Sequence, residues 1–414
     1  MSPGAPAAVP ECEEAPVRPT IGSTIRKPGA PVTEQPRTLH DLETPALLLD
    51  RDILGRNLMR MRSHLQALGV ALRPHVKTTK SIDIAQLALT GFEPRITVST
   101  LHEADYFLQH GLTDMVYAVG IAPGKLRHAA ALIRRGAELT LILDNLSAAR
   151  AVIEAAEGEQ VTYSVLIELD VDGHRGGVRP DSDSLLKIAT LLAGRPGIEL
   201  RGVMTHAGGS YDCRSEDEIR AMAERERAGA VLAAERLRAA GMAAPMVSVG
   251  STPTALFATD LRGVTEVRAG VYMLFDLVMA GLGVCRATDI AASVLVCVIG
   301  HNEERGWIIT DGGWMALSRD RGTAKQAVDQ GFGLVRDHAG ESLPDDLLVA
   351  SVNQEHGIVG RRDGGQIDPA RYPVGTLLRI LPNHACATTA QHQRFQVLDG
   401  DGRIVAVWPR INGW

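Results

Sequence analysis

The chain has 414 residues, a net charge of −6 and 45% hydrophobic residues, which is ordinary for a globular protein large enough for two domains. The excess of acidic residues argues against nucleic acid or an anionic membrane as a partner, and no apolar run approaches the roughly 20 residues that span a bilayer. The five cysteines are widely spaced without a CxxC motif. Together with the lack of a secretory signal pattern, this usage predicts a cytoplasmic protein.

The first residues have a composition typical of disorder. Residues 1–36 are rich in proline, glycine and alanine, and they show no hydrophobic periodicity. We therefore expect a disordered extension that takes no part in catalysis.

From residue 70 to residue 275, short β-branched runs alternate with longer amphipathic stretches, which often begin at serine and end at glycine. Eight such units within about 200 residues predict a closed (β/α)8 barrel of the TIM type. A doubly wound open sheet uses the same alternation and is the alternative. The runs with strand character are Leu72–Lys77, Arg95–Thr100, Asp114–Val119, Leu139–Asp144, Tyr163–Asp170, Leu200–Ala207, Met246–Thr252 and Glu266–Tyr272.

After residue 285 the pattern changes to strand-like runs joined by glycine- and aspartate-rich turns, such as TLLRILPN and FQVLDGDGRIVAVW. We expect these runs to form a β-domain appended to the barrel. Residues 49–285 would then form the barrel, and residues 37–48 would join residues 286–414 in the β-domain.

The first barrel strand, LRPHVK, carries basic side chains at every second position. Arg73, His75 and Lys77 therefore lie on one face, with Lys77 at the strand end. If that face is the barrel interior, burial and neighbouring cations lower the pKa of Lys77 and favour the free amine, which forms Schiff bases. Lys80 lies beyond the strand, where water can reach it. The alternative is a loop in which both lysines are solvated.

In a barrel of this kind, reactive groups sit at the C-terminal ends of the strands. The fifth strand runs into DGHRGG and presents Arg175. The sixth strand ends in THAGGSY, which contains His206 and Tyr211.

A phosphate site is expected after the last two strands, where such barrels commonly have one. Gly250, Ser251 and Thr252 follow the seventh strand, and their backbone and hydroxyl groups suit a phosphate. A GST turn alone is weak evidence for a phosphate site. The combination of such a turn with a lysine across the barrel mouth is what pyridoxal phosphate requires. The eighth strand places four residues on one face: Glu266, Arg268, Gly270 and Tyr272.

The segment ILPNHACATT holds His384 and Cys386 one residue apart, so on a strand both would point the same way. Imidazole and thiolate suit Zn²⁺, and two ligands would leave positions open for water or substrate. The alternative is a buried cysteine and a hydrogen-bonded histidine at a strand end. Two further segments are ambiguous: residues 318–324, SRDRGTA, are expected to form a surface loop, and Glu355 and His356 in NQEHG either orient a ligand or close a turn.

Taken together, these motifs resemble the fold-type III pyridoxal-phosphate enzymes of the D-serine dehydratase and D-threonine aldolase group. The resemblance runs from about residue 41 to Trp414. It is carried by RPHVKTTKS, DGHRGGV, THAGGSY, VSVGSTPTA, TEVRAGVY, GWMALSRDRGTA, NQEHGI and LPNHACATT. These motifs are specific to the group, but they distinguish less well between the activities of its members.

The resemblance implies a homodimer with an active site between the barrel and the β-domain. Lys77 would carry pyridoxal phosphate, and His384 and Cys386 would hold a divalent metal, zinc or manganese, near the substrate's β-hydroxyl. A similarity to the more distant alanine racemases implies three further contacts of the cofactor: Arg268 at the pyridine nitrogen, His206 against the ring and Arg175 near the phenolic oxygen.

The resemblance also implies a reaction. A dehydratase of D-3-hydroxyamino acids, such as D-threo-3-hydroxyaspartate or D-serine, removes the α-proton and loses the β-hydroxyl with help from the metal, giving a 2-keto acid and ammonia. The aldolases of the group tend to have an acidic residue where this chain has Cys386, which favours the dehydratase. The alternatives are aldol cleavage to glycine and an aldehyde, and a non-enzymatic pyridoxal-phosphate carrier.

Overall fold

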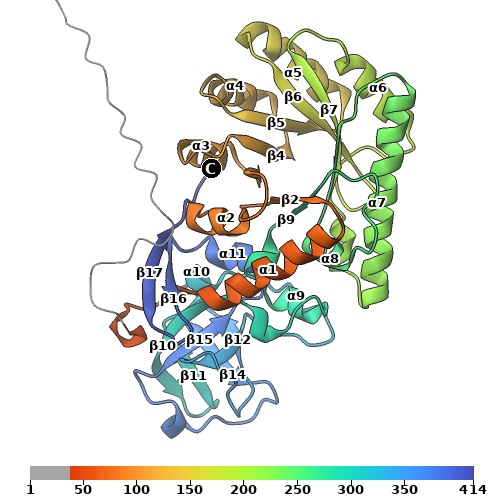
Figure 1. Ribbon diagram of the computed structural model, residues 1–414. Helices are drawn as coiled ribbons and strands as arrows, with labels where there is room; N and C mark the ends of the chain where they lie inside the picture. Colours follow the sequence, from red (N-terminus) through yellow and green to blue (C-terminus); the bar gives the residue numbers. More distant parts are fainter. Residues whose placement is uncertain (1–37) are drawn as a thin grey trace, which may run out of the picture.

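The computed structural model describes residues 38–414, so the extension expected over residues 1–36 lies outside the described part of the chain. The chain forms an eight-stranded parallel sheet and a nine-stranded, mainly antiparallel sheet. Figure 1 shows the first sheet with its helices coloured orange to green, and the second mainly in blue.

The eight predicted barrel strands are confirmed. They follow the order β2-β9-β8-β7-β6-β5-β4-β3. A parallel bridge between His75 and Thr97 joins the two end strands, and the Val76 amide donates to the Thr97 carbonyl at 3.0 Å. The sheet is therefore a closed barrel rather than an open sheet. The strands are β2 Ala71–Pro74, β3 Arg95–Val98, β4 Asp114–Gly120, β5 Glu138–Leu143, β6 Tyr163–Leu169, β7 Ile198–Thr205, β8 Met246–Val249 and β9 Glu266–Ala269.

Several barrel helices begin at a side-chain cap close behind a strand. Thr100 accepts a hydrogen bond from the Glu103 amide at the start of α3, and Asn145 accepts one from the Ala148 amide at the start of α5. Each cap satisfies an amide that the first helical turn leaves without a partner. Within residues 38–414, none of the helices is long and apolar enough to cross a membrane. The helices are α1 Arg51–Ala67, α2 Ile82–Ala88, α3 Leu101–Gln109, α4 Leu126–Arg134, α5 Leu146–Glu159, α6 Asp183–Leu192, α7 Glu216–Ala239, α8 Thr252–Phe257 and α9 Leu277–Gly281.

The nine-stranded sheet is the β-domain predicted from the change in sequence pattern. Its order is β11-β14-β13-β12-β15-β10-β1-β16-β17. The strand β1, Ala46–Asp50, precedes the barrel in the chain but pairs here with β10 and β16. The other elements are β10 Ala292–Asn302, β11 Trp307–Thr310, α10 Trp314–Leu317, β12 Leu334–Asp337, β13 Leu347–Val352, β14 Gly357–Arg361, β15 Leu377–Leu381, α11 Ala385–Thr389, β16 Arg394–Leu398 and β17 Ile404–Pro409.

The β-domain also holds the turn that follows β2. The Thr389 hydroxyl, at the end of α11, donates to the Thr78 carbonyl at 2.9 Å. The buried Arg410, after β17, donates from Nε to the Thr79 carbonyl at 2.8 Å. The C-terminus accordingly lies beside the barrel near α2 and α3 (Figure 1). These bonds fix the segment next to Lys77 against the second sheet.

Candidate active site

A cavity of about 490 Å³ is lined both by the C-terminal ends of barrel strands and by residues of the β-domain. This volume is within the usual range for small-molecule sites. The cavity brings together every residue predicted for the site, although they are spread over some three quarters of the sequence. These residues are Lys77, Arg175, His206, Tyr211, Gly250, Ser251, Thr252, Arg268, Gly270, His384 and Cys386.

Lys77 lies in the turn directly after β2, which ends at Pro74. Its side chain is exposed and lines the cavity, so the expectation of a desolvated Lys77 is wrong. The predicted alternation is seen earlier on the strand, where Arg73 is fully buried and His75 is half-buried. The change from strand to turn explains the difference, because it releases Lys77 from the barrel interior. A small molecule in the cavity can therefore reach the amine.

Lys80 was expected to be open to water, and this is also wrong. Its Nζ lies 3.2 Å from Oε1 of Glu103, and the two side chains are 16% and 1% exposed. Lys80 is therefore held in an ion pair with a buried carboxylate of α3. Of the two lysines in the motif, Lys77 faces the cavity and Lys80 stabilises the turn.

Two histidines next to Lys77 are held neutral. Burial, reinforced by the charge of Lys77, brings the pKa of His75 well below its ordinary value. Burial also lowers the pKa of His206 to about 3, although its hydrogen bond to the Gly250 carbonyl opposes the shift. That bond is 2.9 Å long and joins Nδ1 to the carbonyl, so Nδ1 carries the proton. The neutral imidazoles add no positive charge to this wall of the cavity.

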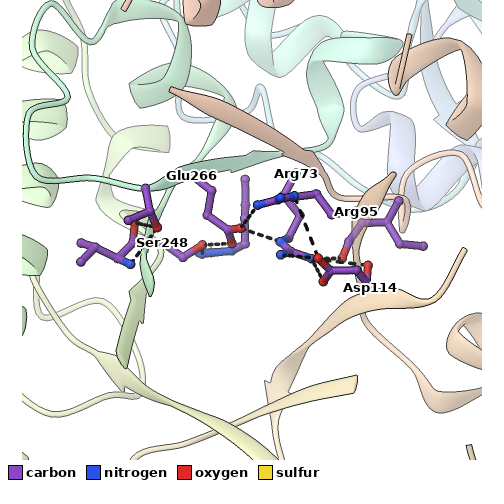
Figure 2. Close-up of polar contacts among 9 residues, drawn as sticks. Arg73, Arg95, Asp114, Ser248 and Glu266 are labelled. Carbon is purple, nitrogen blue, oxygen red and sulfur yellow. Dashed lines mark hydrogen bonds and ion pairs between the residues drawn. The ribbon is translucent and has the colours of Figure 1, made fainter. Parts of the chain in front are cut away.

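Arg268 is 4% exposed and is held by the neighbouring strands of the barrel. Its Nη1 donates to Oγ of Ser248 at 3.0 Å, and its Nη2 donates to the Thr205 carbonyl. Ser248 in turn donates to Oε1 of Glu266 at 2.5 Å. Figure 2 shows Ser248 and Glu266 within the charged network of the barrel interior, which continues to Arg73. The guanidinium of Arg268 is therefore fixed before any ligand binds.

Gly250, Ser251 and Thr252 form the turn from β8 into α8. The Ser251 hydroxyl accepts from the Thr254 amide at 3.3 Å and so caps the helix. The Thr252 hydroxyl accepts from the Tyr272 amide at 3.2 Å. The hydroxyls therefore shape the turn, and the Ser251 amide also bonds inside it, donating to Oγ1 of Thr254 at 3.1 Å.

Tyr272 was expected on the same face as Arg268. Instead β9 ends at Ala269, and Tyr272 is fully buried in a 3-10 turn. The strand alternation cannot continue beyond this point, so Tyr272 takes no place in the cavity wall, while Gly270 does.

Gly250 is a position that accepts no side chain. Its φ is +138°, and a Cβ would lie 2.1 Å from the carbonyl oxygen of Arg268. Gly250→Ala is therefore expected to lower the free energy of unfolding by about 3 kcal/mol, through backbone strain and steric overlap. Urea denaturation measures this change.

Gly55→Ala in α1 is the control, because nothing lies within 4 Å of the added Cβ. This substitution is expected to stabilise the protein by about 0.5–1 kcal/mol, as alanine is the better helix former. Equal effects at the two positions would contradict the role assigned to Gly250.

Arg175 and Tyr211 come from two loops that are hydrogen-bonded to each other. Nη2 of Arg175 lies 3.6 Å from Oε1 of Glu168, and the arginine side chain is 54% exposed. Burial raises the pKa of Tyr211, which keeps the phenol neutral. Between the loops, Asp172 accepts a hydrogen bond from the Gly209 amide at 2.7 Å. Both side chains are thus presented to the cavity from a joined pair of loops.

His384 and Cys386 do not lie on a strand, contrary to expectation. β15 ends at Leu381, His384 is the residue before α11, and Cys386 lies in the first turn of that helix. Both side chains nevertheless line the cavity. Burial acts to raise the pKa of Cys386, but the neighbouring His384 outweighs it and lowers the pKa. The helix start brings imidazole and thiolate together in place of the expected strand.

Asp320, Asp276 and Thr78 were missed by the sequence reasoning. Asp320 was assigned to a surface loop, but it lines the cavity, and its Oδ2 lies 2.8 Å from Nδ1 of His384. Asp276 is 2% exposed and accepts from the amide of α11's first residue at 3.0 Å. Oγ1 of Thr78 lies 3.2 Å from Sγ of Cys386. In the sequence, these three residues were distinguished only by lying inside or beside the family motifs.

The NQEHG segment lies apart from the cavity. Glu355 and His356 are exposed, and the Asn353 amide donates to the His356 carbonyl at 2.8 Å. Within one chain this segment closes the turn between β13 and β14, which was the simpler of the two expectations.

The donors in the cavity fit a metal with open coordination positions. Within residues 38–414, no group of three or more His, Cys, Asp or Glu side chains is arranged to hold a metal. A metal here would therefore rest on the imidazole of His384 and the thiolate of Cys386. These ligand types suit zinc, and open positions are typical of catalytic rather than structural sites.

The cavity also fits pyridoxal phosphate. Its wall offers a reachable amine at Lys77, a fixed buried cation at Arg268 and the turn of Gly250, Ser251 and Thr252. Gly250 and Gly270 belong to this part of the wall. An amine, a phosphate cradle and a polar group for the ring are the contacts that this cofactor uses.

Comparison with known proteins matches the two parts of the chain to two known domains. Residues 49–277 match the alanine racemase N-terminal domain, and residues 291–398 match the putative serine dehydratase domain. D-threo-3-hydroxyaspartate dehydratase from Delftia sp. HT23 is 52% identical over 91% of this chain and 99% of that protein. Its solved structure has a TM-score of 0.89, covering 91% of this chain and 100% of that one. A cysteine-to-alanine mutant of that dehydratase has been solved in a metal-free form.

More distant relatives share both halves of the chain. D-serine dehydratase from Dictyostelium discoideum is 28% identical over 91% of this chain and 98% of that protein. The structure of D-threonine aldolase from Filomicrobium marinum is 25% identical, with a TM-score of 0.77, covering 90% of this chain and 97% of that one. The dehydratases and the aldolases are thus built on the same fold.

The closed barrel, the β-domain with its histidine and cysteine at the start of α11, and the two domain matches all point to one family. The chain belongs to the fold-type III pyridoxal-phosphate enzymes that join an alanine racemase N-terminal domain to a serine dehydratase domain, and it is a lyase.

Proposed function

We propose that this chain is a pyridoxal-phosphate- and metal-dependent dehydratase of D-3-hydroxyamino acids. Its products would be a 2-keto acid and ammonia, and D-threo-3-hydroxyaspartate and D-serine are the candidate substrates. The observation that carries the proposal is that Lys77 and the pair of His384 and Cys386 line one cavity. The dehydratase relatives, at 52% and 28% identity, support it.

Each part of the cavity would hold one group. Lys77 would hold pyridoxal phosphate, and His384 and Cys386 would hold the metal, zinc by ligand type with manganese as the alternative. When bound, the cofactor supplies an electron sink for the α-carbon, and the metal supplies a Lewis acid for the β-hydroxyl. The other contacts of the cofactor would come from Arg175, His206, Tyr211, Gly250, Ser251, Thr252, Arg268 and Gly270.

Lys77 is the base in this proposal. Its amine lines the cavity and would take the α-proton of the substrate at Nζ. His75 and His206 are neutral, so they add no charge that would repel a proton from that amine. Arg268 is fixed as a hydrogen-bond donor by Ser248 and Thr205, and it would keep the ring nitrogen unprotonated. With Arg268 in that role, the contribution of His384 and Cys386, which would hold the metal near the hydroxyl, becomes more important.

The test is product analysis with the purified protein, pyridoxal phosphate and a divalent metal. D-threo-3-hydroxyaspartate, D-serine and D-threonine are incubated separately. A keto acid with ammonia is expected, and the relative rates identify the preferred substrate. Glycine with an aldehyde would instead establish aldol cleavage, and the cysteine at position 386 would then not report the type of reaction.

Metal dependence is tested in the same assay. EDTA is expected to abolish turnover, and added Zn²⁺ or Mn²⁺ is expected to restore it. Turnover that persists in EDTA would rule out metal-assisted loss of the hydroxyl. Both D-serine and D-threonine are needed here, since a metal-dependent aldolase would respond to EDTA in the same way.

We also propose that the chain divides into a barrel over residues 49–285 and a β-domain over residues 37–48 and 286–414. The pairing of β1 with β10 and β16 supports the placement of residues 37–48 in the β-domain, and the strand continues to Asp50. The family resemblance supports a homodimer, and the cysteine usage supports a cytoplasmic location. Analytical ultracentrifugation tests the dimer.

A further inference from the structure

The carboxylate of Asp320 is hydrogen-bonded to the His384 ring. Its Oδ2 lies 2.8 Å from Nδ1 of His384, and both side chains line the cavity. Asp320 comes from the segment between α10 and β12, while His384 is the residue directly before α11. The contact therefore joins two segments 64 residues apart, and no local turn requires it.

The backbone around Asp320 is shaped to hold this carboxylate. Ser318 has a φ of +78°, in the left-handed region that residues other than glycine rarely adopt. The Asp320 amide donates to the Ser318 hydroxyl at 3.3 Å, and the Gly322 amide donates to Oδ1 of Asp320 at 2.7 Å. A Cβ at Gly322 would lie 2.6 Å from Cγ2 of Val278. One carboxylate oxygen is thus held by the segment itself, and the other is turned to His384.

We propose that Asp320 is a positioning residue for the metal ligand His384. The bond to Nδ1 fixes the ring's orientation and its tautomer and leaves Nε2 as the nitrogen available to a metal. A carboxylate behind a ligating histidine also makes the ring a stronger donor. This inference rests on the metal site proposed above, and it adds a residue from outside the HxC motif.

The competing explanation is purely structural. Asp320 and His384 would then form an ion pair that joins two segments of the β-domain and has no effect on metal binding. The two explanations differ in one measurable property, the dissociation constant of the metal.

The experiment measures Mn²⁺ binding to the protein loaded with pyridoxal phosphate, using the EPR signal of free Mn²⁺. Asp320→Asn keeps the shape of the side chain but removes the charge that fixes the tautomer. We expect Mn²⁺ to bind about 10- to 100-fold more weakly. The cofactor's absorbance should stay unchanged, because Lys77 does not contact Asp320. Asp320→Glu restores the carboxylate and is expected to recover most of the affinity.

Asp181→Asn is the control for loss of one carboxylate. Asp181 is 58% exposed and pairs with Arg179 at 2.8 Å, and it does not line the cavity. The Mn²⁺ dissociation constant of this variant should equal that of the unaltered protein.

Two results would overturn the proposal. If Asp320→Asn binds Mn²⁺ as tightly as the unaltered protein, or if Asp320→Glu binds no better than Asp320→Asn, the carboxylate does not position the ligand, and the proposed function still stands. If the unaltered protein binds no Mn²⁺ and no Zn²⁺ by equilibrium dialysis, the metal site itself fails, and the role of Asp320 fails with it. Should Asp320→Asn not fold, Asp320→Ala takes its place in the same measurement, with the same expected loss of Mn²⁺ affinity.

Discussion

Replacing Lys77 with alanine is expected to abolish both the bound cofactor's absorbance and the turnover of substrate. Lys77 is the reachable amine of the cavity wall, and in the proposed reaction it is also the base. Loss of a positioned base alone lowers a rate by about 10²- to 10⁴-fold, and loss of the covalent attachment adds to this. The visible spectrum of the purified protein and the rate of keto acid formation measure the two effects separately.

Lys80→Ala is the matched control, because Lys80 lies three residues away in the same turn. Its Nζ pairs with Glu103 at 3.2 Å rather than facing the cavity. The variant should keep the cofactor's absorbance while losing stability, since Glu103 is left buried without its cation. If Lys77→Ala kept the absorbance while Lys80→Ala lost it, the two lysines would have been assigned the wrong way round.

The barrel was predictable because its signal is local and repeated. Each strand is a short buried run, and several helices begin with a cap such as Thr100 or Asn145. The order of strands follows from the chain order once the connections are short and right-handed. The existence of the β-domain was predictable from the change in sequence pattern, but the pairing of its strands was not. The position of β1 between β10 and β16 depends on contacts across some 250 to 350 residues.

The site residues were predictable where they sit at strand ends, and they were misjudged where the strand stops early. Lys77 is exposed because β2 ends at Pro74, three residues before it. Cys386 reaches the cavity from a helix, although alternation on a strand was the reason for expecting it there. Asp320 could not be predicted, because its partner is brought to it by the folding of the β-domain and not by spacing.

The interior of the barrel also contains contacts that could not be predicted from the sequence. The basic face of β2 was visible in the sequence, but the acids that neutralise it were not. Nε of Arg73 lies 2.8 Å from Oε2 of Glu266, and its Nη1 lies 2.7 Å from Oδ1 of Asp114 (Figure 2). These carboxylates come from β9 and β4, on either side of β2 and β3 in the closed barrel. Only closure of the barrel brings the three charges together.

Arg73→Met is therefore expected to destabilise the protein by about 3–5 kcal/mol, the usual cost of removing one partner of a buried ion pair. The Arg73 side chain is fully buried and that of Glu266 is 1% exposed, so water cannot replace the guanidinium. Arg95 also pairs with Glu266, but its Nη1 lies 3.9 Å from Oε2, so it compensates that charge less than Arg73 does at 2.8 Å. The free energy of unfolding in urea measures the loss.

Two further variants show whether the cost comes from the buried charge. Arg179→Met breaks the exposed pair between Arg179 and Asp181, whose side chains are 74% and 58% exposed, and it should leave the free energy of unfolding nearly unchanged. Adding Glu266→Gln to Arg73→Met should recover part of the lost stability, because the amide removes the uncompensated charge. If the second substitution lowers stability further by its full single-variant amount, the two residues are independent. The network would then be a set of separate hydrogen bonds and not a coupled ion pair beneath the active site.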